Sequence, residues 1–562
     1  MLSAACQCQC SEGPAQVVEH VAVPNEGLPH LPQLLEVEVP EERQRLWVER
    51  GGLELDPVLA SGALLLLDAG SLIQLASSGG ILQPRQTLPP AAFASHSTVR
   101  AATHQVPETI GQSQKGAFPL FTAVLRIVCV SHCWLQPRHP DPLGYNLRVL
   151  GRALALLLRA DAFGPGVWSV FFDLCGLHQA CRDREGIPQQ RTFAWLEDDS
   201  GFADGAVGRF ISEEMLFKEA LTSLGILYSH PHTIVFMLTQ FPPDYDDPGV
   251  YDRSGNVESY MNRGWCFMEL SLARMVKHSH FSLDLGRATG AEEVFLATTD
   301  GNRVRDSCLA GTCAVSQLAP AIPEAFEASL ERKIFTAGKV DRLRVAGIYS
   351  DTFKSRICKI SLLHYVSSGW GDSEAGQLAD LIASGMPKLW GLGVIDSRIG
   401  DDGFAKLSEA LVAPGGPQAL EGLVVNHNAV GDRGAARLAE AAAEPGALRS
   451  LRGLALIGNR VGDEGAARLA AAAATPGALP ALEALNLAGN GIGDRGARAL
   501  ADALASPEAL PSLRRLVLSG NARVGGAGRD ALQVAWAAAS RPTEGEFPSV
   551  RNQEMLQAGL FV

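Results

Sequence analysis

The chain has 562 residues and a formal net charge of −13, because 61 acidic residues outnumber 48 lysine and arginine residues. This acidic balance argues against a general nucleic-acid binder, which needs a basic face to displace counterions from phosphates. Hydrophobic residues make up 46% of the chain and charged residues 19%, so the composition excludes a chain that is disordered throughout and predicts several globular domains.

The first 29 residues contain three alternating cysteines, Cys6, Cys8 and Cys10, which would share one face of an extended chain. We interpret residues 1–29 as a flexible terminus, with acylation or soft-metal binding as the alternatives. The segment lacks the basic and apolar regions of a secretory signal. The eleven cysteines of the chain are scattered through apolar runs, which is typical of reduced thiols, so we expect a cytoplasmic protein.

Residues 30–119 predict a small module and linker of unknown type. They contain one apolar block, Pro57 to Ala76, and then a stretch rich in Ser, Gly, Pro and Thr. No part of the chain reaches the roughly 18 uncharged apolar residues of a membrane helix, so we expect no membrane span. The sequence has neither a phosphate-binding G-x-x-x-x-G-K-[ST] loop nor zinc-type H-E-x-x-H or paired C-x-x-C spacing, so we expect no ATPase module and no metal site.

Between residues 120 and 320 apolar runs alternate with amphipathic stretches, which predicts an open, parallel α/β sheet of the flavodoxin-like type. We expect strands at 121–132, 167–179, 232–240 and 292–298, and helices at 147–160, 213–228 and 263–279. Binding sites of such sheets lie at the carboxyl ends of the strands. The candidate residues at or just beyond these ends are Ser131, His132, Trp134, Asp173 and Gln179.

The order of these elements and the run WCFMEL at residues 265–270 resemble the TIR domain, whose third helix commonly carries W-C-x-x-E-L. The runs SHCW at 131–134 and RGW at 263–265 are also similar to fungal HET-type and algal TIR-like proteins. The first loop differs from the TIR pattern, because it carries His132, Trp134 and His139 in place of a short charged loop.

This resemblance implies that Glu269 is the catalytic residue of NAD⁺ glycohydrolysis, with NAD⁺ as a substrate and no cofactor. Cleavage of the ribose–nicotinamide bond creates an oxocarbenium-like centre that one carboxylate can stabilise. Trp134 or Trp265 would stack on a ring of the ligand, and the polar candidates would line the pocket. The alternative is structural, because an acid early in a helix also favours the helix dipole. A nucleophilic role for Cys266 has no support in the spacing.

Residues 321–354 predict a helical junction, and residues 355–562 contain an internal repeat. The segments LEGLVVNHNAV, LRGLALIGNRV, LEALNLAGNGI and LRRLVLSGNAR align without gaps. Their asparagines, Asn428, Asn459, Asn490 and Asn521, follow a period of 31 residues. The segment from Leu389 fits the same frame with Ser397 in the Asn position, and we expect a degenerate copy near Ser355.

Each copy predicts a short strand from its L-x-L alternation and a helix from the Ala/Leu-rich stretch that follows. We expect the Asn amide to satisfy backbone groups where the chain leaves the strand, and Asp432, Asp463 and Asp494 to lie in the N-cap region of the helices. One copy cannot bury its apolar face alone, so the copies stack. The pattern resembles the long, helix-bearing leucine-rich repeat of the ribonuclease-inhibitor class, and the last 20 residues predict an apolar cap.

We expect a protein partner on the concave face of this solenoid, where the strand positions between the leucines are small and mostly uncharged: Gly393, Val424, Ala455, Asn486 and Val517. The chain therefore predicts an intracellular signalling or immune-type receptor-like protein whose TIR-like domain either cleaves NAD⁺ or self-associates. Two alternatives stay open. One is a non-enzymatic protein-interaction scaffold, and the other is a nucleoside N-glycosidic transferase with a similar sheet and carboxylates.

Overall fold

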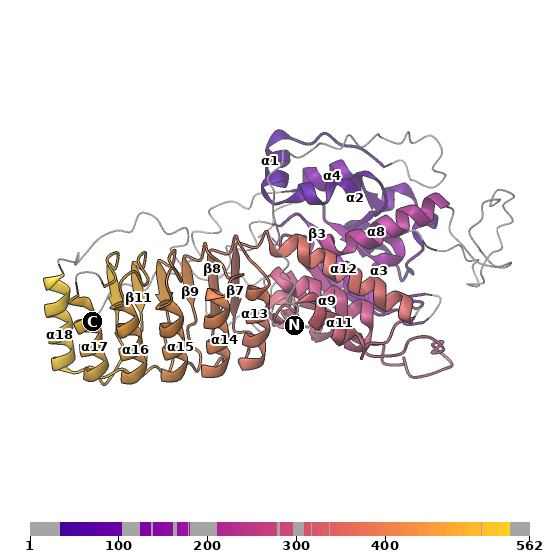
Figure 1. Ribbon diagram of the computed structural model, residues 1–562. Coiled ribbons are helices and arrows are strands. Elements are labelled where there is room, and N and C mark those ends of the chain that lie inside the picture. The colour runs from indigo at the N-terminus through magenta and orange to yellow at the C-terminus, as the bar shows by residue number, and fades with distance from the viewer. Residues whose placement is uncertain are drawn as a thin grey trace.

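A mixed α/β domain and a solenoid share the chain, and Figure 1 shows the solenoid extending from one side of the domain. The computed structural model describes residues 34–103, 124–136, 139–160, 166–177, 179, 211–277, 281–295, 308–315, 317–336, 338–506 and 509–539. The alternating cysteines near the start of the chain and the expected C-terminal cap lie outside these residues. None of the helices in the described ranges combines the length and apolar character that crossing a bilayer requires.

The α/β domain is built on one six-stranded sheet with the order β2-β1-β4-β3-β5-β6. Its strands are β1 (Leu66–Asp68), β2 (Phe93–Ala94), β3 (Ile127–His132), β4 (Ser169–Phe171), β5 (Ile234–Leu238) and β6 (Ser282–Asp284). The four neighbouring strands β4, β3, β5 and β6 run parallel to one another. Every residue of β3, β4 and β5 is buried, as expected for strands that are covered by helices on both faces.

The sheet is not purely parallel, in contrast to the sequence-based expectation. Strand β1 pairs antiparallel with both β2 and β4, and Leu67 is opposite Val170. Residues that we expected in a separate module therefore extend the main sheet. The physical reason lies in the leucine run before Asp68, because Leu64 and Leu66 pack into one core cluster and Leu65 and Leu67 into the other. An alternation of this kind fits a strand whose two faces are both buried.

The last strand of the sheet also differs from the prediction. We expected it at residues 292–298, whereas β6 is Ser282–Asp284 and Val294 makes only an isolated bridge with Cys308. Phe295 packs against Phe236 with ring centroids 6.3 Å apart. Residues 292–295 therefore contribute side-chain packing on the sheet and no named strand, and residues 296–298 of the expected strand lie outside the described residues.

Helices cover both faces of the sheet. Helices α3 (Ala69–Ser77), α6 (Tyr145–Leu158) and α10 (Leu309–Cys313) pack on one face. The other face is covered by α2 (Asp56–Ala60), α8 (Ile211–Ser229) and α9 (Gly264–Val276). Helices α1 (Glu41–Glu49) and α4 (His96–Ala102) pack together beside α2, and the short α7 (Asp173–Gly176) follows β4 directly.

Two helices join the domain to the solenoid. They are α11 (Pro323–Leu330) and α12 (Lys339–Ile357), and α12 packs against both α8 and α9. Phe326 of α11 stacks on Phe267 of α9 and on Tyr349 of α12, with centroids 5.4 and 3.7 Å apart. The junction is therefore packed into the core of the domain and does not behave as a loose linker.

The solenoid contains a second six-stranded sheet, which is entirely parallel and follows chain order. Its strands are β7 (Leu362–Val366), β8 (Gly391–Ile395), β9 (Gly422–Val424), β10 (Gly453–Ala455), β11 (Ala484–Asn486) and β12 (Arg515–Val517). Each strand is followed by one helix: α13 (Asp372–Ala383), α14 (Asp401–Val412), α15 (Asp432–Ala442), α16 (Asp463–Ala473), α17 (Asp494–Leu504) and α18 (Gly526–Ala538). The pairs Gly422↔Gly453 and Gly453↔Ala484 show the 31-residue period as sheet register.

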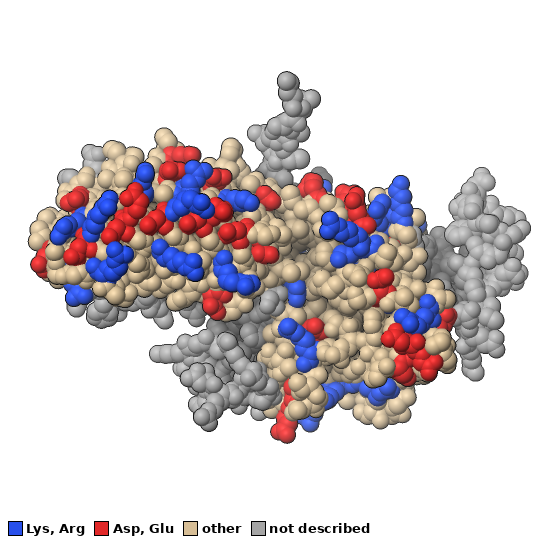
Figure 2. All heavy atoms as spheres, turned by 90° about the horizontal axis from the view of Figure 1, so that it is seen from below, with Lys and Arg blue, Asp and Glu red and all other residues tan. Residues whose placement is uncertain are grey.

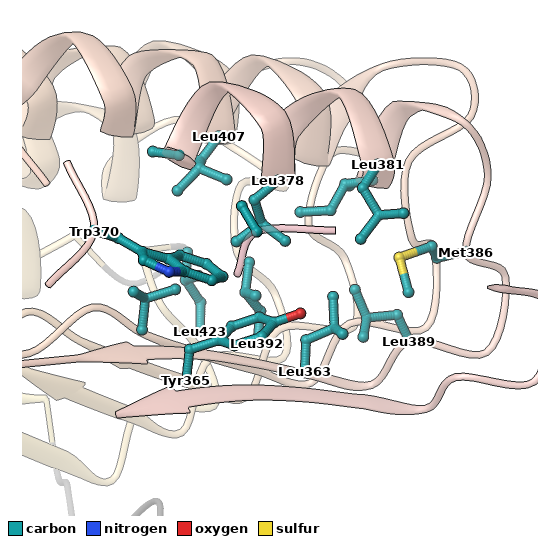
Figure 3. Close-up of a cluster of buried hydrophobic side chains, with 14 of the residues drawn as sticks. Leu363, Tyr365, Trp370, Leu378, Leu381, Met386, Leu389, Leu392, Leu407 and Leu423 are labelled. Atoms are coloured by element: carbon teal, nitrogen blue, oxygen red, sulfur yellow. The ribbon is translucent and has the colours of Figure 1, made fainter. Parts of the chain in front are cut away.

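The degenerate first repeat begins later than the expected position near Ser355. Helix α12 runs to Ile357, and the first solenoid strand starts at Leu362. Figure 3 shows how Tyr365 and Trp370 fill the core of this repeat beneath leucines of the helices. The Trp370 indole N–H donates to the carbonyl of Gln317 at 2.9 Å, which ties the first repeat to the α/β domain.

The asparagine ladder has the role that the sequence predicts. The Asn428 Oδ1 accepts from the N–H of Ile399 in the preceding repeat at 3.0 Å, and its Nδ2 donates to the carbonyls of Val394 and Asn426. Asn459, Asn490 and Asn521 repeat this pattern. Each amide therefore satisfies backbone groups of two repeats where the chain leaves the strand.

The aspartates act differently from the expectation. The N-cap of each helix from α13 to α18 is a glycine, and Asp432, Asp463 and Asp494 are the first helical residues. The Asp432 Oδ1 accepts from the N–H groups of Gly462 and Gly465 in the next repeat at 2.6 and 2.9 Å. Each aspartate therefore satisfies the free N–H groups at the start of the following helix.

Candidate functional site

The candidate residues lie where strand β3 ends, between the two helical layers. Side chains of a strand point alternately to opposite faces, so Ser131 and His132 diverge there. Ile127 and Cys129 lie on the α8/α9 side with Ser131, whereas Val128 and Val130 lie on the α3/α6 side with His132. The strand therefore offers one polar side chain to each side of its carboxyl end.

On the α9 side, Ser131 contacts both an acid and a phenol. Its hydroxyl donates to Glu269 Oε2 at 2.5 Å and lies 2.5 Å from the Tyr260 hydroxyl. Glu269 is on the second turn of α9, and Tyr260 lies in the short turn that precedes the helix. Ser131 and Tyr260 are buried, whereas Glu269 is partly exposed. The carboxyl group thus has one oxygen fixed by Ser131.

The surroundings of Glu269 favour its neutral form. Burial raises the pKa of Glu269 to about 8, although the hydrogen bond from Ser131 acts in the opposite direction. The negative charge of Asp173 adds to the increase. Glu269 therefore holds a proton at neutral pH and is poised to lose it under mildly basic conditions or beside a cation.

On the other side of β3, Asp173 is held by two donors. His132 Nε2 and Trp134 Nε1 each lie 2.8 Å from a different oxygen of the Asp173 carboxylate. The His132 ring is also stacked on Phe172, with centroids 4.2 Å apart. Asp173 keeps 32% of its side chain exposed while the His132 side chain keeps 2%. The Asp173 carboxylate is thus held by the His132 and Trp134 rings and is also reachable from solvent.

The His132–Asp173 pair carries opposite charges. Burial disfavours charge on both groups, but their mutual attraction and hydrogen bond outweigh it, so the pKa of His132 is raised and the pKa of Asp173 is lowered. An ionised, oriented carboxylate of this kind can accept hydrogen bonds from sugar hydroxyls. The two acids that flank β3 therefore differ in protonation state, since Asp173 is ionised and Glu269 is protonated.

Two candidates from the sequence have other contacts. The Gln179 amide donates to the backbone carbonyls of Asp173 and Leu177, at 3.0 and 3.3 Å, and so braces the loop after α7. Trp265 packs, partly buried, against the core on the α9 side. The structure thus brings Ser131, His132, Trp134, Asp173 and Glu269 together around the end of β3, with Gln179 behind them.

Sequence reasoning missed Tyr260 and the full role of Arg263. The Arg263 guanidinium donates to the carbonyls of Glu258 and Trp134, at 2.7 and 2.6 Å, so it ties the start of α9 to the loop after β3. Tyr260 is 129 residues from Ser131 along the chain. The only sequence signal was their position directly before the WCFMEL run.

In the described residues, no group of three or more His, Cys, Asp or Glu side chains is placed to hold a metal ion.

The solenoid offers two different surfaces. Val366, at the outward end of β7, keeps 39% exposure, and the same row continues with the partly exposed Ile395, Asn426, Ile457 and Ala488. The small residues at the row beside it, such as Val424 and Ala455, are buried. Figure 2 shows that acidic and basic side chains alternate over the helical face of the solenoid instead. Many of them pair, as Arg433 does with Asp402 and Arg437 with Glu409.

A family model described as Leucine Rich repeat matches residues 479–501, which contain strand β11 and most of helix α17. No curated protein matches the chain at a significant level. Together with the 31-residue register of the parallel sheet and the asparagine ladder, the match shows that the C-terminal region is a leucine-rich-repeat solenoid.

Proposed function

We propose that the solenoid binds a protein partner on its strand face and that the α/β domain cleaves the N-glycosidic bond of NAD⁺ beside Glu269. Leucine-rich-repeat solenoids form extended concave surfaces that suit protein partners. The observation that carries the enzymatic part is the placement of two unlike carboxyl groups, Glu269 and Asp173, on either side of the end of β3. The likeness of residues 265–270 to the TIR motif supports the choice of substrate.

The chemistry needs a carboxylate close to the anomeric carbon. Breaking the ribose–nicotinamide bond leaves positive charge on the ribose ring, and a carboxylate stabilises that charge. Nicotinamide leaves as a neutral molecule, so no general acid is needed. Glu269 fits this role because Ser131 fixes one of its oxygens and its side chain is partly exposed.

The protonation state of Glu269 is consistent with a cationic substrate. The nicotinamide ring of NAD⁺ carries a positive charge, and an opposite charge within about 4–6 Å favours the ionised carboxylate. Binding would therefore draw the proton from Glu269 just before the bond breaks. Asp173, held by His132 and Trp134, would accept hydrogen bonds from the ribose hydroxyls. Trp134 is partly exposed and could stack on a ring of the dinucleotide.

The test of this proposal is nicotinamide release from NAD⁺ by the purified full chain, alone and after forced clustering. Glu269→Gln keeps the size and the hydrogen bond to Ser131 but cannot ionise, so it should abolish release. Glu327→Gln, on the exposed face of α11, is the matched control and should release nicotinamide at the wild-type rate. Equal release by wild type and Glu269→Gln, or none by wild type in either state, would remove the enzymatic part.

The mostly apolar row from Val366 to Ala488 on the strand face gives a separate test of partner binding. Ile395→Glu would place a charge on that row, whereas Arg437→Ala alters the helical face. Partners that cross-link to the row in cells should be lost with Ile395→Glu and kept with Arg437→Ala. The opposite result would move the binding surface to the helices.

Two alternatives make different predictions with the same samples. A scaffold would self-associate through the α/β domain and release no nicotinamide, and it is favoured by Glu269 already being hydrogen-bonded and neutral. A nucleoside N-glycosidic transferase would release a base only when an acceptor is present. Product analysis with and without a second nucleobase separates the three activities.

A further inference from the structure

Two thiols lie in contact between the loop after β3 and the first turn of helix α9. Cys133 follows His132 directly, and Cys266 lies on the first turn of α9, three positions before Glu269. Their sulfur atoms are 3.9 Å apart, and both side chains are buried, with 3% and 4% exposure. The Cys266 thiol also donates to the carbonyl of His132 at 3.3 Å. The mechanism proposed above uses neither sulfur.

We propose that Cys133 and Cys266 are a redox-active pair, which a peroxide converts to a disulfide and a small dithiol reduces again, and that this bond controls the Glu269 site. A disulfide requires sulfur atoms about 2.05 Å apart, so each sulfur has to move by only about 1 Å. The pair joins the loop after β3 to the helix that carries the acid. The control of activity rests on the proposed function, whereas formation of the bond does not.

The surroundings distinguish an attacking and a resolving thiol. The contact with Cys266 lowers the pKa of Cys133, and the Arg263 guanidinium lowers it further against the effect of burial. Cys266 has its pKa raised by the same contact and by burial. The Arg263 guanidinium, whose Nη2 is buried without a hydrogen-bond partner among the described residues, favours the thiolate form of both cysteines. Because the Cys266 thiol donates its proton to the His132 carbonyl, we assign Cys133 as the nucleophile and Cys266 as the resolving thiol.

The reaction balances with one peroxide. The Cys133 thiolate attacks the peroxide oxygen, the O–O bond breaks, and the departing hydroxide takes up a proton as water. The Cys266 sulfur then attacks the resulting sulfenic acid, the S–O bond breaks, and a second water leaves. Two thiols and one hydrogen peroxide thus give one disulfide and two waters. A dithiol returns both protons and electrons by exchange.

The bond would act on the site through His132 and Glu269. Oxidation removes the Cys266 proton, so the His132 carbonyl loses its donor. It also draws the loop after β3 toward α9, which alters the spacing of Ser131 and Glu269, now 2.5 Å between hydroxyl and carboxyl oxygens. A misplacement of about 1 Å costs a catalytic site up to about a hundredfold in rate. We therefore expect the oxidised protein to be at least about tenfold slower in nicotinamide release.

The experiment treats the full chain with hydrogen peroxide, blocks the remaining thiols and maps tryptic peptides by mass. Residues 127–138 and 264–274 should appear as one cross-linked species that a dithiol separates. Because residues 127–138 also contain Cys129, Cys133→Ala must abolish the species, and Cys266→Ala must abolish it too. Cys358→Ser, which removes a partly exposed thiol, must leave it intact.

The outcomes separate this inference from the proposed function. Oxidation of Cys358 without any cross-link between the two peptides overturns the redox pair, and this result needs no variant that might misfold. A cross-link with unchanged nicotinamide release overturns the control of the site. If nicotinamide is not released in either redox state, the proposed function fails while the peptide map still decides whether the disulfide forms.

Discussion

Asp401 of one repeat accepts a hydrogen bond from the backbone N–H of Gly434 in the next, at 2.8 Å and across 33 residues of sequence. The same oxygen accepts from Gly431 at 2.7 Å. This contact recurs in the later repeats, where Asp432, Asp463 and Asp494 each receive two N–H groups. In the last described repeat Gly526 occupies the position of the aspartate. The aspartates therefore couple neighbouring repeats into one folding unit.

Removing this coupling should destabilise the solenoid. Asp401→Ala leaves two partly buried N–H groups without an acceptor, so we expect a loss of about 1–3 kcal/mol in the free energy of unfolding. Chemical denaturation of the full chain measures it. The matched control is the neighbouring Asp402, whose ion pair with Arg433 is exposed on both sides. Asp402→Ala should cost less than about 1 kcal/mol, and similar losses for both variants would contradict the role of Asp401.

The glycine opposite this aspartate should be intolerant of a methyl group. A helical Gly→Ala change ordinarily stabilises by up to about 1 kcal/mol. At Gly434, however, the new Cβ would lie 2.8 Å from Asp401 Oδ1 and 3.3 Å from Asp401 Cα. We expect Gly434→Ala to lower the denaturation midpoint, while Gly526→Ala, where nothing lies within 4 Å, leaves it unchanged or raises it. An increase at Gly434 would show that the repeats can move apart without cost.

The raised pKa of Glu269 makes a prediction about stability that does not depend on any activity. The unfolded chain releases this proton near its ordinary pKa of about 4.3, whereas the folded protein holds it to about 8. Stability conferred by the protonated acid is therefore complete at low pH and is lost progressively as pH rises from about 4.5 to about 8. Glu269→Gln should match wild type near pH 4 and exceed it by a few kcal/mol above pH 8, because one unit of pKa corresponds to about 1.4 kcal/mol. If the free energies of unfolding of wild type and Glu269→Gln changed in parallel with pH, the raised pKa of Glu269 would be contradicted.

Ionisation of Glu269 should also appear in the pH dependence of kcat/KM for nicotinamide release. If the ionised Glu269 stabilises the transition state, kcat/KM for nicotinamide release rises with pH and levels off above about 8, because this quantity reports the free enzyme. The Glu327→Gln control should show the same profile as wild type. A profile that falls between pH 6 and 9 would mean that the protonated acid is the active form, which is a different mechanism.

The periodic part of the fold could be predicted from the sequence because its signals are local and repeated. The asparagines at Asn428 and Asn459 and the L-x-L strands recur at a fixed spacing, and the parallel register reproduces that spacing. The role of the aspartates could not be predicted in the same way. Asp432 lies beside the start of its own helix, and only the stacking of repeats brings it to Gly462.

Contacts between residues far apart in the sequence explain the remaining differences between the predicted and the observed fold. Leu67 pairs with Val170 across about a hundred residues, and nothing in either segment marks the partner, so the addition of β1 and β2 to the sheet was not foreseen. The candidate acids were predicted from strand ends and a short motif. The opposite directions of Ser131 and His132, and the contact of Ser131 with Tyr260, emerge only when β3 is placed between its helical layers.

The most direct measurement for the central claim is the rate at which the clustered full chain releases nicotinamide from NAD⁺ at pH 8, compared between wild type and Glu269→Gln. We expect a measurable rate for wild type, the same rate for Glu327→Gln, and a loss of at least about a hundredfold for Glu269→Gln. Release by Glu269→Gln at the wild-type rate would contradict it, because the carboxyl group beside Ser131 would then take no part in breaking the bond.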